Sequence, residues 1–312
     1  MLRYSVKRIL SAVPVLLGIS LLAFILGVLS PGDPAEFALN QDGLSDPTEG
    51  QIAAMRREMG LDRPMWQQYL SWLAAVLHGN LGQSFINGRD IAQEIWLRLP
   101  ATAAIAVTAL VIAAAGGILL GTACALKHGK PLDNIIKNLT NIMLAVPGFW
   151  LSLLLILIFC ETLQLLPTSG MDSWKSLVLP ALALSFSTMA TVCRYMRGAL
   201  LEEFGRQYFL TARVRGISRI RLLLFYALPN AIVPVIAILG NYFAGVLGGS
   251  VIAESIFAIP GISSMALEAI RFRDYPVLQA YVLVTGTVLV LVTVAVDLFI
   301  AFLNPKIKLG GR

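Results

Sequence analysis

The chain has 312 residues, of which 57% are hydrophobic and only 13% are charged, and its mean hydropathy is +0.77. Ordinary soluble domains carry roughly 25% charged residues, and a soluble protein of this length cannot hide so much apolar surface in one core. The composition therefore excludes a soluble enzyme, a disordered chain and a nucleic-acid-binding domain. The net charge of +6 has to be placed along the chain before it is interpreted.

Six apolar runs are long enough to cross a bilayer, which takes about 20 helical residues. They predict membrane-spanning helices over about 9–30, 101–126, 138–160, 176–195, 225–253 and 277–303. The first run follows Arg3, Lys7 and Arg8, as a signal peptide would, but it is too long for a signal core and no small-residue cleavage site follows it. We therefore expect an uncleaved first helix and an all-α integral membrane protein with one transmembrane domain over residues 1–312.

The distribution of charge predicts the orientation of these helices. With the N-terminus in the cytoplasm, the cytoplasmic segments hold 16 basic residues and three acidic ones. The outer segments then hold 8 basic and 14 acidic residues. Because cytoplasmic loops carry an excess of Lys and Arg, both termini are expected inside. The net positive charge follows from this topology and requires no nucleic acid.

The longest connection, residues 33–100, is expected outside the membrane. Within it, Trp66, Tyr69, Leu70 and Trp72 recur at helical spacing. Such a pattern with tryptophans is typical of an amphipathic helix at the outer membrane interface. We interpret this helix as a packed lid on the bundle rather than as a ligand site.

The other long connection, about 198–221, is expected in the cytoplasm, and together with the end of the fourth run it carries seven arginines, more than membrane topology requires. Residues 206–215 predict a short helix, and Gly216 can take the positive φ that ends it. Phe209 and Leu210 are expected to be exposed there, which indicates a surface for a partner.

These residues resemble a known family. Ala212-x3-Gly216, followed by Leu228-Pro229, is similar to the cytoplasmic loop of permeases of binding-protein-dependent ABC importers. Thr211-Ala212-Arg213-x-Arg215-Gly216 resembles their dipeptide, oligopeptide and nickel branch. Further stretches support that branch: Pro31-Gly32-Asp33-Pro34, Gly60-Leu61-Asp62-Arg63-Pro64, Gly82-x-Ser84-Phe85, Leu166-Pro167-Thr168, Leu179-Pro180, Gly248-Gly249-Ser250-Val251-Ile252-x-Glu254-x-Ile256-Phe257, Pro260-Gly261, Arg273-Asp274-Tyr275-Pro276 and Asn304-Pro305. The chain departs from the family pattern at Leu210, Thr211, Ser263 and Asn304.

The resemblance implies a type I ABC importer permease with six helices in the bacterial cytoplasmic (inner) membrane, where it contacts lipid. Its implied partners are a homologous second permease, two ATPase subunits and an extracytoplasmic substrate-binding protein. The implied cargo is short peptides, with nickel or a metal chelate as the alternative and an ATP-independent channel as a more distant one. The sequence has no Gly-x4-Gly-Lys-Ser/Thr loop, so we expect ATP and Mg on the partners, no cofactor in this chain and no enzymatic activity of its own.

The resemblance also implies which residues couple to the ATPase. The candidates are Tyr208, Phe209, Leu210, Thr211, Ala212, Arg213, Arg215 and Gly216. Arg213 and Arg215 either pair with acids of the ATPase or only follow the excess of positive charge inside.

Four other polar residues are candidates from their positions in the apolar runs. Asn241, Ser250 and Glu254 are candidates for the pathway or an outer gate, with subunit packing as the alternative for Glu254. Asp297 is an intramembrane acid, a functional candidate by default, for which we expect a structural role. No histidine lies at bilayer depth, so we expect no metal site and no intramembrane protease.

Overall fold

The computed structural model describes residues 2–29, 32–39 and 47–303. The family-like stretches that contain Pro31 and Asn304, and the basic C-terminal residues, lie outside this part of the chain. Within it the elements are helices, without a strand, which confirms the all-α prediction. The helices are α1 (Leu2–Val28), α2 (Pro34–Leu39), α3 (Glu49–Glu58), α4 (Met65–Leu77), α5 (Ile91–Leu126), α6 (Pro131–Ala145), α7 (Gly148–Leu155), α8 (Val178–Gly205), α9 (Gln207–Val214), α10 (Arg219–Leu222), α11 (Leu228–Gly249), α12 (Val251–Ile256), α13 (Ile262–Phe272) and α14 (Tyr275–Leu303). Short π- and 3-10-helical stretches add Ile156–Thr162, Trp174–Leu177 and Leu223–Ala227.

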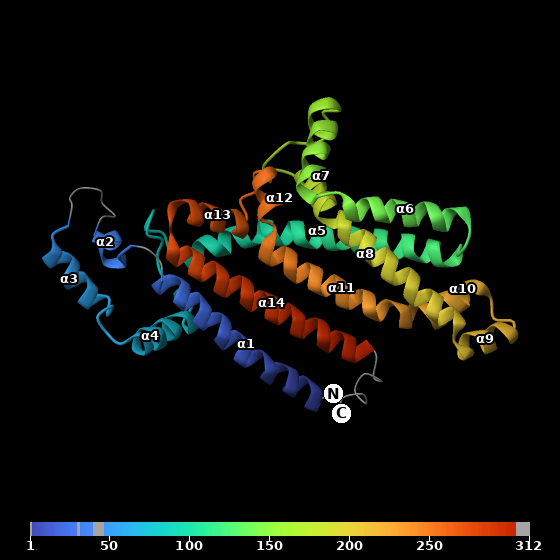
Figure 1. Cartoon of the computed structure of the whole chain (residues 1–312), viewed down its shortest axis with the longest axis horizontal. Coiled ribbons are helices and arrows are strands. Elements are labelled where there is room, and N and C mark those ends of the chain that lie inside the picture. Colours follow the sequence, from blue (N-terminus) through green and yellow to red (C-terminus); the bar gives the residue numbers. More distant parts are fainter. Residues whose placement is uncertain (1, 30–31, 40–46, 304–312) are drawn as a thin grey trace.

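The long helices form an elongated bundle, with α1 beside α14 and α5 packed along α8 (Figure 1). Helices α2 to α4 lie at one end of the bundle, and α9 and α10 lie at the other (Figure 1). Small residues bring α5 and α8 together, because a Cβ at Gly121 would lie 2.6 Å from the carbonyl oxygen of Cys193 and 2.7 Å from Cβ of Met196. Close approach at glycine is a usual way to pack membrane helices.

Five helical segments of the described residues are long and apolar enough to cross a membrane, and six if one bent pair counts as a span. The bent pair occupies the expected run 138–160, which is two helices at 100° to each other rather than one straight helix. Pro147 lies between them as the residue before α7. Proline lacks an N–H and its ring disfavours a helical conformation of the residue before it, which accounts for the break after α6.

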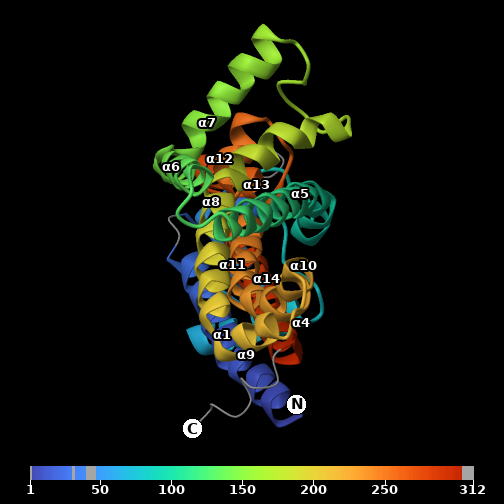
Figure 2. The same cartoon turned by 90° about the vertical axis from the view of Figure 1, so that its right-hand side faces the viewer.

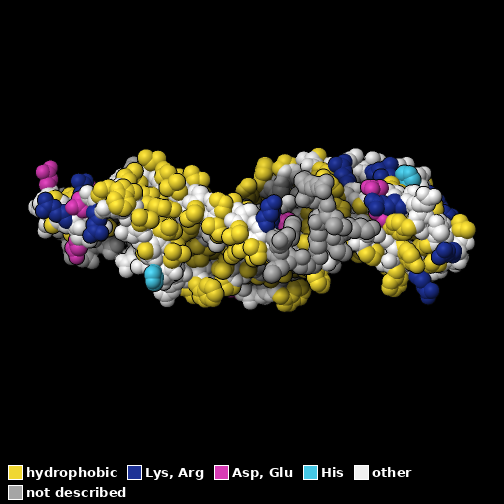
Figure 3. Space-filling model, turned by 90° about the horizontal axis from the view of Figure 1, so that it is seen from below, with side chains coloured by type: hydrophobic (Ala, Val, Ile, Leu, Met, Phe, Trp, Pro, Cys, Tyr) yellow, Lys and Arg dark blue, Asp and Glu magenta, His cyan; other side chains and the backbone are white. Residues whose placement is uncertain are grey.

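The surface agrees with a membrane location. Seen from below the view of Figure 1, hydrophobic side chains cover much of the described surface between the two ends, and most of the visible charged side chains gather toward the ends (Figure 3). A hydrocarbon layer favours this distribution, because charged side chains are costly at its centre. The two ends therefore correspond to the two aqueous sides.

Helix α4 is the amphipathic helix expected in the outer connection. It packs on α1 through a 2.8 Å hydrogen bond between the hydroxyls of Tyr69 and Ser20, and through Phe24, whose ring centroid lies 5.4 Å from that of Tyr69 and 5.8 Å from that of Trp72. Trp66 is 62% exposed on the other face. The helix is thus a packed element with one free apolar face.

Candidate functional site

Helix α9 turns two of its expected coupling residues inward. Phe209 and Ala212 are 9% and 6% exposed, and they belong to the apolar core that also contains Met196, Leu200 and Leu222. Residues three apart lie on the same face of a helix, so one face of α9 is an anchor. The expectation that Phe209 is exposed is therefore wrong, and its role is to hold α9 on the bundle.

The opposite face of α9 is open. Gln207, Leu210, Thr211 and Val214, with Gly205 at the end of α8, line a shallow depression of about 410 Å³. Leu210 is 47% exposed and Val214 is 88% exposed. The sequence interpretation missed Gln207 and Val214, although their spacing from Leu210 puts them on its face of the helix. We call these four α9 residues the outward face of α9.

Tyr208 fixes the start of α9 through hydrogen bonds. Its hydroxyl donates to the carboxylate of Glu203 at the buried end of α8. The Asn230 amide donates to the Tyr208 hydroxyl at 3.2 Å and to the Tyr226 carbonyl at 3.0 Å. Burial raises the pKa of the Tyr208 phenol, and its bond to Glu203 raises the pKa further. Tyr208 therefore ties α9 to α8 and to the start of α11. Figure 2 shows the molecule from the end that carries α9.

The chain leaves α9 through a left-handed glycine. Gly216 has φ +79°, and the amide of Ile217 donates to the carbonyl of Ala212 at 3.3 Å. Arg213 and Arg215 are exposed, and neither forms an ion pair within the described part of the chain. Nothing lies within 4 Å of a Cβ built at Gly216, so the constraint there is the backbone conformation alone.

This geometry predicts that Gly216→Val destabilises the exit from α9, whereas Gly216→Asn is tolerated. A left-handed conformation costs an ordinary L-residue about 1–2 kcal/mol, and asparagine adopts it more readily. We expect transport by the valine variant to fall by about tenfold, the equivalent of 1.4 kcal/mol, and transport by the asparagine variant to stay within about twofold of the parent. Equal activity of the two variants in an uptake assay would contradict the assignment.

A buried polar cluster lies at the outer end of α11. Glu254 is 0% exposed and accepts hydrogen bonds from Thr102 (2.8 Å), Ser250 (2.6 Å) and the backbone amide of Ser264 (2.8 Å). The structure thus brings together two predicted residues, Ser250 and Glu254. Asn241 lies earlier in α11, away from this cluster in the sequence, and is exposed. The sequence interpretation missed Thr102 and Ser264, which come from α5 and α13.

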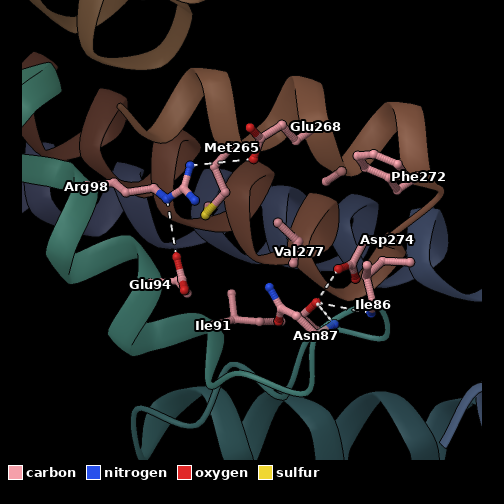
Figure 4. A pocket seen from close by; sticks show the side chains of 12 residues that line it. Ile86, Asn87, Ile91, Glu94, Arg98, Met265, Glu268, Phe272, Asp274 and Val277 are labelled. Atoms are coloured by element: carbon pink, nitrogen blue, oxygen red, sulfur yellow. Dashed lines mark hydrogen bonds and ion pairs between the residues drawn. The ribbon is translucent and has the colours of Figure 1, made fainter. Parts of the chain in front are cut away.

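A cavity of about 170 Å³ lies further along the same two helices, between α5, α13 and the turn before α5 (Figure 4). Arg98 reaches from α5 between Glu94, at 3.2 Å, and Glu268 of α13, at 3.7 Å. Asp274 accepts a 2.5 Å hydrogen bond from Ser84 at the far side of the cavity (Figure 4). Two family-like motifs of the sequence therefore meet through Ser84 and Asp274.

Asp297 has a partner within the same chain. Nε of Arg8, on α1, lies 2.6 Å from Oδ2 of Asp297 on α14. An acid on an apolar helix is stabilised when a basic group pairs with it. The pair joins the first and last long helices, and the structural role of Asp297 stays a prediction.

The Arg8–Asp297 pair predicts a double-mutant result. Arg8→Ala and Asp297→Ala should each lower the free energy of unfolding in detergent by about 1 kcal/mol, near the upper end for partly exposed pairs. The double variant should lose little more than either single variant, because both remove one interaction. Fully additive losses in thermal unfolding would contradict the pairing.

An ion pair with a buried carboxylate lies at the opposite end of the bundle from the polar cluster around Glu254. Asp133, at 0% exposure, accepts from Arg197 at 2.8 and 2.9 Å, from the Gly129 amide at 3.0 Å and from the Cys124 thiol at 3.0 Å. These contacts join α5, α6 and α8. The sequence interpretation placed Asp133 and Arg197 only as topology signals. Within the described residues, no three His, Cys, Asp or Glu side chains form a group that could hold a metal ion.

Comparison with known proteins adds the family. Residues 117–309 match the family described as binding-protein-dependent transport system inner membrane component, and residues 1–106 match the N-terminal region of such membrane components. The chain is 32% identical over 339 aligned positions to the dipeptide transport system permease protein DppB of Escherichia coli strain K12, with 99% of each chain covered. It is 33% identical over 308 positions to the glutathione transport system permease protein GsiC of Salmonella choleraesuis strain SC-B67, again with 99% of each covered.

Solved structures show the same fold at lower identity. The inward-facing MetNI methionine ABC transporter matches with a TM-score of 0.57 and 15% identity, covering 67% of this chain and 96% of that one. An amino acid ABC transporter with histidines matches with a TM-score of 0.52 and 16% identity, covering 73% and 96%. With its apolar spans and these relatives, the chain belongs to the family of inner-membrane components of binding-protein-dependent transport systems and is a multi-pass protein of the inner membrane.

Proposed function

We propose that this chain is the permease subunit of an ATP-driven importer and forms half of the translocation pathway for short peptides. The observation that carries the proposal is the full-length similarity to a dipeptide permease and a glutathione permease, each covering 99% of both chains. Dipeptides and glutathione share a peptide backbone, a free carboxylate and an amino group. Short peptides are therefore the cargo class that these two relatives have in common.

The outward face of α9 is the proposed contact with the ATPase. Leu210 and Val214 present an apolar patch beside the shallow depression, and Arg213 and Arg215 stand free near it. An exposed apolar patch with polar surroundings is typical of a protein interaction surface. Phe209, Ala212 and Tyr208 then transmit force from this patch to the bundle, because they hold α9 on it. ATP and Mg bind on the partners, and this chain carries no catalytic residue.

The remaining partners follow from the same proposal. A second homologous permease completes the pathway, two ATPases bind in the cytoplasm, and an extracytoplasmic binding protein docks on the side of α2, α3, α4 and α13. Both termini and α9 lie in the cytoplasm, as the excess of basic residues on that side supports.

Uptake by the complete complex in proteoliposomes tests the cargo. The complex should be purified with both permeases, the ATPases and the binding protein, and offered labelled dipeptide, glutathione and a nickel chelate in parallel. The proposal expects ATP-dependent uptake of dipeptide or glutathione, at least about tenfold above the nickel chelate. Uptake of the nickel chelate alone would refute the peptide assignment, and uptake without ATP would refute the importer.

A further inference from the structure

Helix α13 is bounded at both ends by residues in an unusual backbone conformation. Ala258, before the helix, has φ +47°, and Arg273, at its C-terminal end, has φ +58°. Residues other than glycine rarely adopt this left-handed region, and such residues are concentrated at functional and switch segments. Contacts with the surrounding structure must therefore hold α13 in place.

Glu254 supplies the N-terminal cap of α13 from a different helix. The residue before the helix is Gly261, which has no side chain to cap it. Instead, the Glu254 carboxylate accepts from the amide of Ser264, and the Thr102 hydroxyl accepts from the amide of Ile262 at 3.0 Å. Thr102 in turn donates to Glu254. Free amides and the helix dipole at an N-terminus favour a negative group there. A carboxylate is therefore a favourable cap for α13.

The Glu254 carboxylate depends on the position of α13 for one of its hydrogen bonds. Glu254 is fully buried, and its hydrogen bonds come from two hydroxyls and one amide, with no cation paired to it in the described part of the chain. The backbone of Gly261 packs against it so closely that a Cβ there would collide with the carboxyl group. If α13 moved away, the acid would lose the amide and the Thr102–Ile262 link would break. A buried carboxyl oxygen that loses its hydrogen-bond partner is unfavourable, so these contacts favour the docked position of α13.

The rest of α13 packs on α5 and α14 through an apolar core that includes Met265 and Ala269. A cavity of about 170 Å³ opens beside this core (Figure 4), and Arg98 and Glu268, whose side chain is 62% exposed, form a 3.7 Å pair across it. An exposed pair of this kind contributes little. The directional polar contacts of α13 with α5 and α12 are thus concentrated at its start, around Glu254 and Thr102.

We propose that Glu254 is the positioning residue that clasps α13 to α5 at the outer end, and that release of this clasp opens the outer end during transport. This inference rests on the proposed importer function. In it, docking of the binding protein supplies the free energy that releases α13. Weakening the clasp therefore shifts the population toward the open state without the binding protein.

The test measures ATP hydrolysis by the assembled complex in the absence of the binding protein. Glu254→Gln replaces one of the two acceptor oxygens by an NH2 group that cannot accept, so the donors of Thr102, Ser250 and Ser264 face one acceptor oxygen. Thr102→Val removes the bridging hydroxyl with little change in shape. We expect hydrolysis without the binding protein to rise by at least about threefold in both variants. Combining the two substitutions should add little, because both break one contact. Glu268→Gln, on the same helix, should behave as the parent.

A structural role alone would give a different result. It would lower thermal stability and lower hydrolysis in parallel, and hydrolysis would still require the binding protein; that outcome overturns the proposal, as does parental behaviour of both variants. If Glu254→Gln does not assemble, Thr102→Val decides. Labelling of Ala269→Cys, which is 4% exposed on α13, by a membrane-impermeant maleimide should accelerate in the same variants. Failure of the importer function is separate, since the parent complex would then show no stimulation by the binding protein.

Discussion

Arg197→Ala is expected to lower the free energy of unfolding by about 3 kcal/mol, because the buried carboxylate of Asp133 loses its hydrogen-bonded cation and keeps only the more distant Lys137, at 3.9 Å. Asp133 is 0% exposed, and Arg197 provides two of its hydrogen bonds, at 2.8 and 2.9 Å. The pair joins α8 to α6, so its loss weakens the packing between two helices and not only a contact at the surface. Thermal or denaturant unfolding of the purified chain in detergent measures this change.

Arg194→Ala is the matched control for this prediction. Arg194 is exposed on the same helix, where it donates a hydrogen bond to the side chain of Asn141. Its loss is expected to cost less than about 1 kcal/mol, as for other exposed polar pairs. Equal destabilisation by Arg194→Ala and Arg197→Ala would show that the buried pair does not hold the bundle together.

Leu210→Glu is expected to abolish coupling while the chain stays folded. Leu210 is 47% exposed on the outward face of α9, so a charge there meets water in the free subunit but would be buried against the ATPase in the proposed contact. Burying an unpaired charge is costly, and we expect ATP-dependent uptake to fall by at least about a hundredfold, equivalent to 2.7 kcal/mol. The melting temperature of the subunit should hardly change.

The adjacent residue provides the contrast. Phe209 is 9% exposed in the core beneath α9, and Phe209→Ala should cost about 3–5 kcal/mol of stability, as other large core truncations do. Uptake should then fall together with the folded fraction. If Leu210→Glu destabilised the subunit as much as Phe209→Ala, or left uptake unchanged, the orientation of α9 would be contradicted.

Local sequence signals predicted the helices and the place of α9. Length and hydropathy of each run predicted the long spans, and helical spacing around Trp66 predicted α4, observed at Met65–Leu77. The short helix expected at 206–215 is observed at Gln207–Val214, and Gly216 has the expected positive φ. These features depend on neighbours within a few residues, which the sequence shows directly.

Features that depend on tertiary contact could not be predicted in the same way. Phe209 is apolar in either orientation, and only packing on Met196 and Leu222 shows that it faces inward. The bend after α6 involves Pro147, but membrane helices also tolerate proline without bending by 100°. Glu254 and Thr102 are 152 residues apart, so a single sequence gives no sign that they meet.

Cross-linking of α9 to the ATPase tests the central claim most directly. The native cysteines are buried, so a cysteine introduced at Val214, which is 88% exposed, can be probed in the assembled complex. A short thiol cross-linker should join Val214→Cys to the ATPase subunit. It should not join Glu268→Cys, at the outer end, to that subunit. Cross-linking of the ATPase to Glu268→Cys, or none to Val214→Cys in a complex that transports, would contradict both the coupling surface and the orientation.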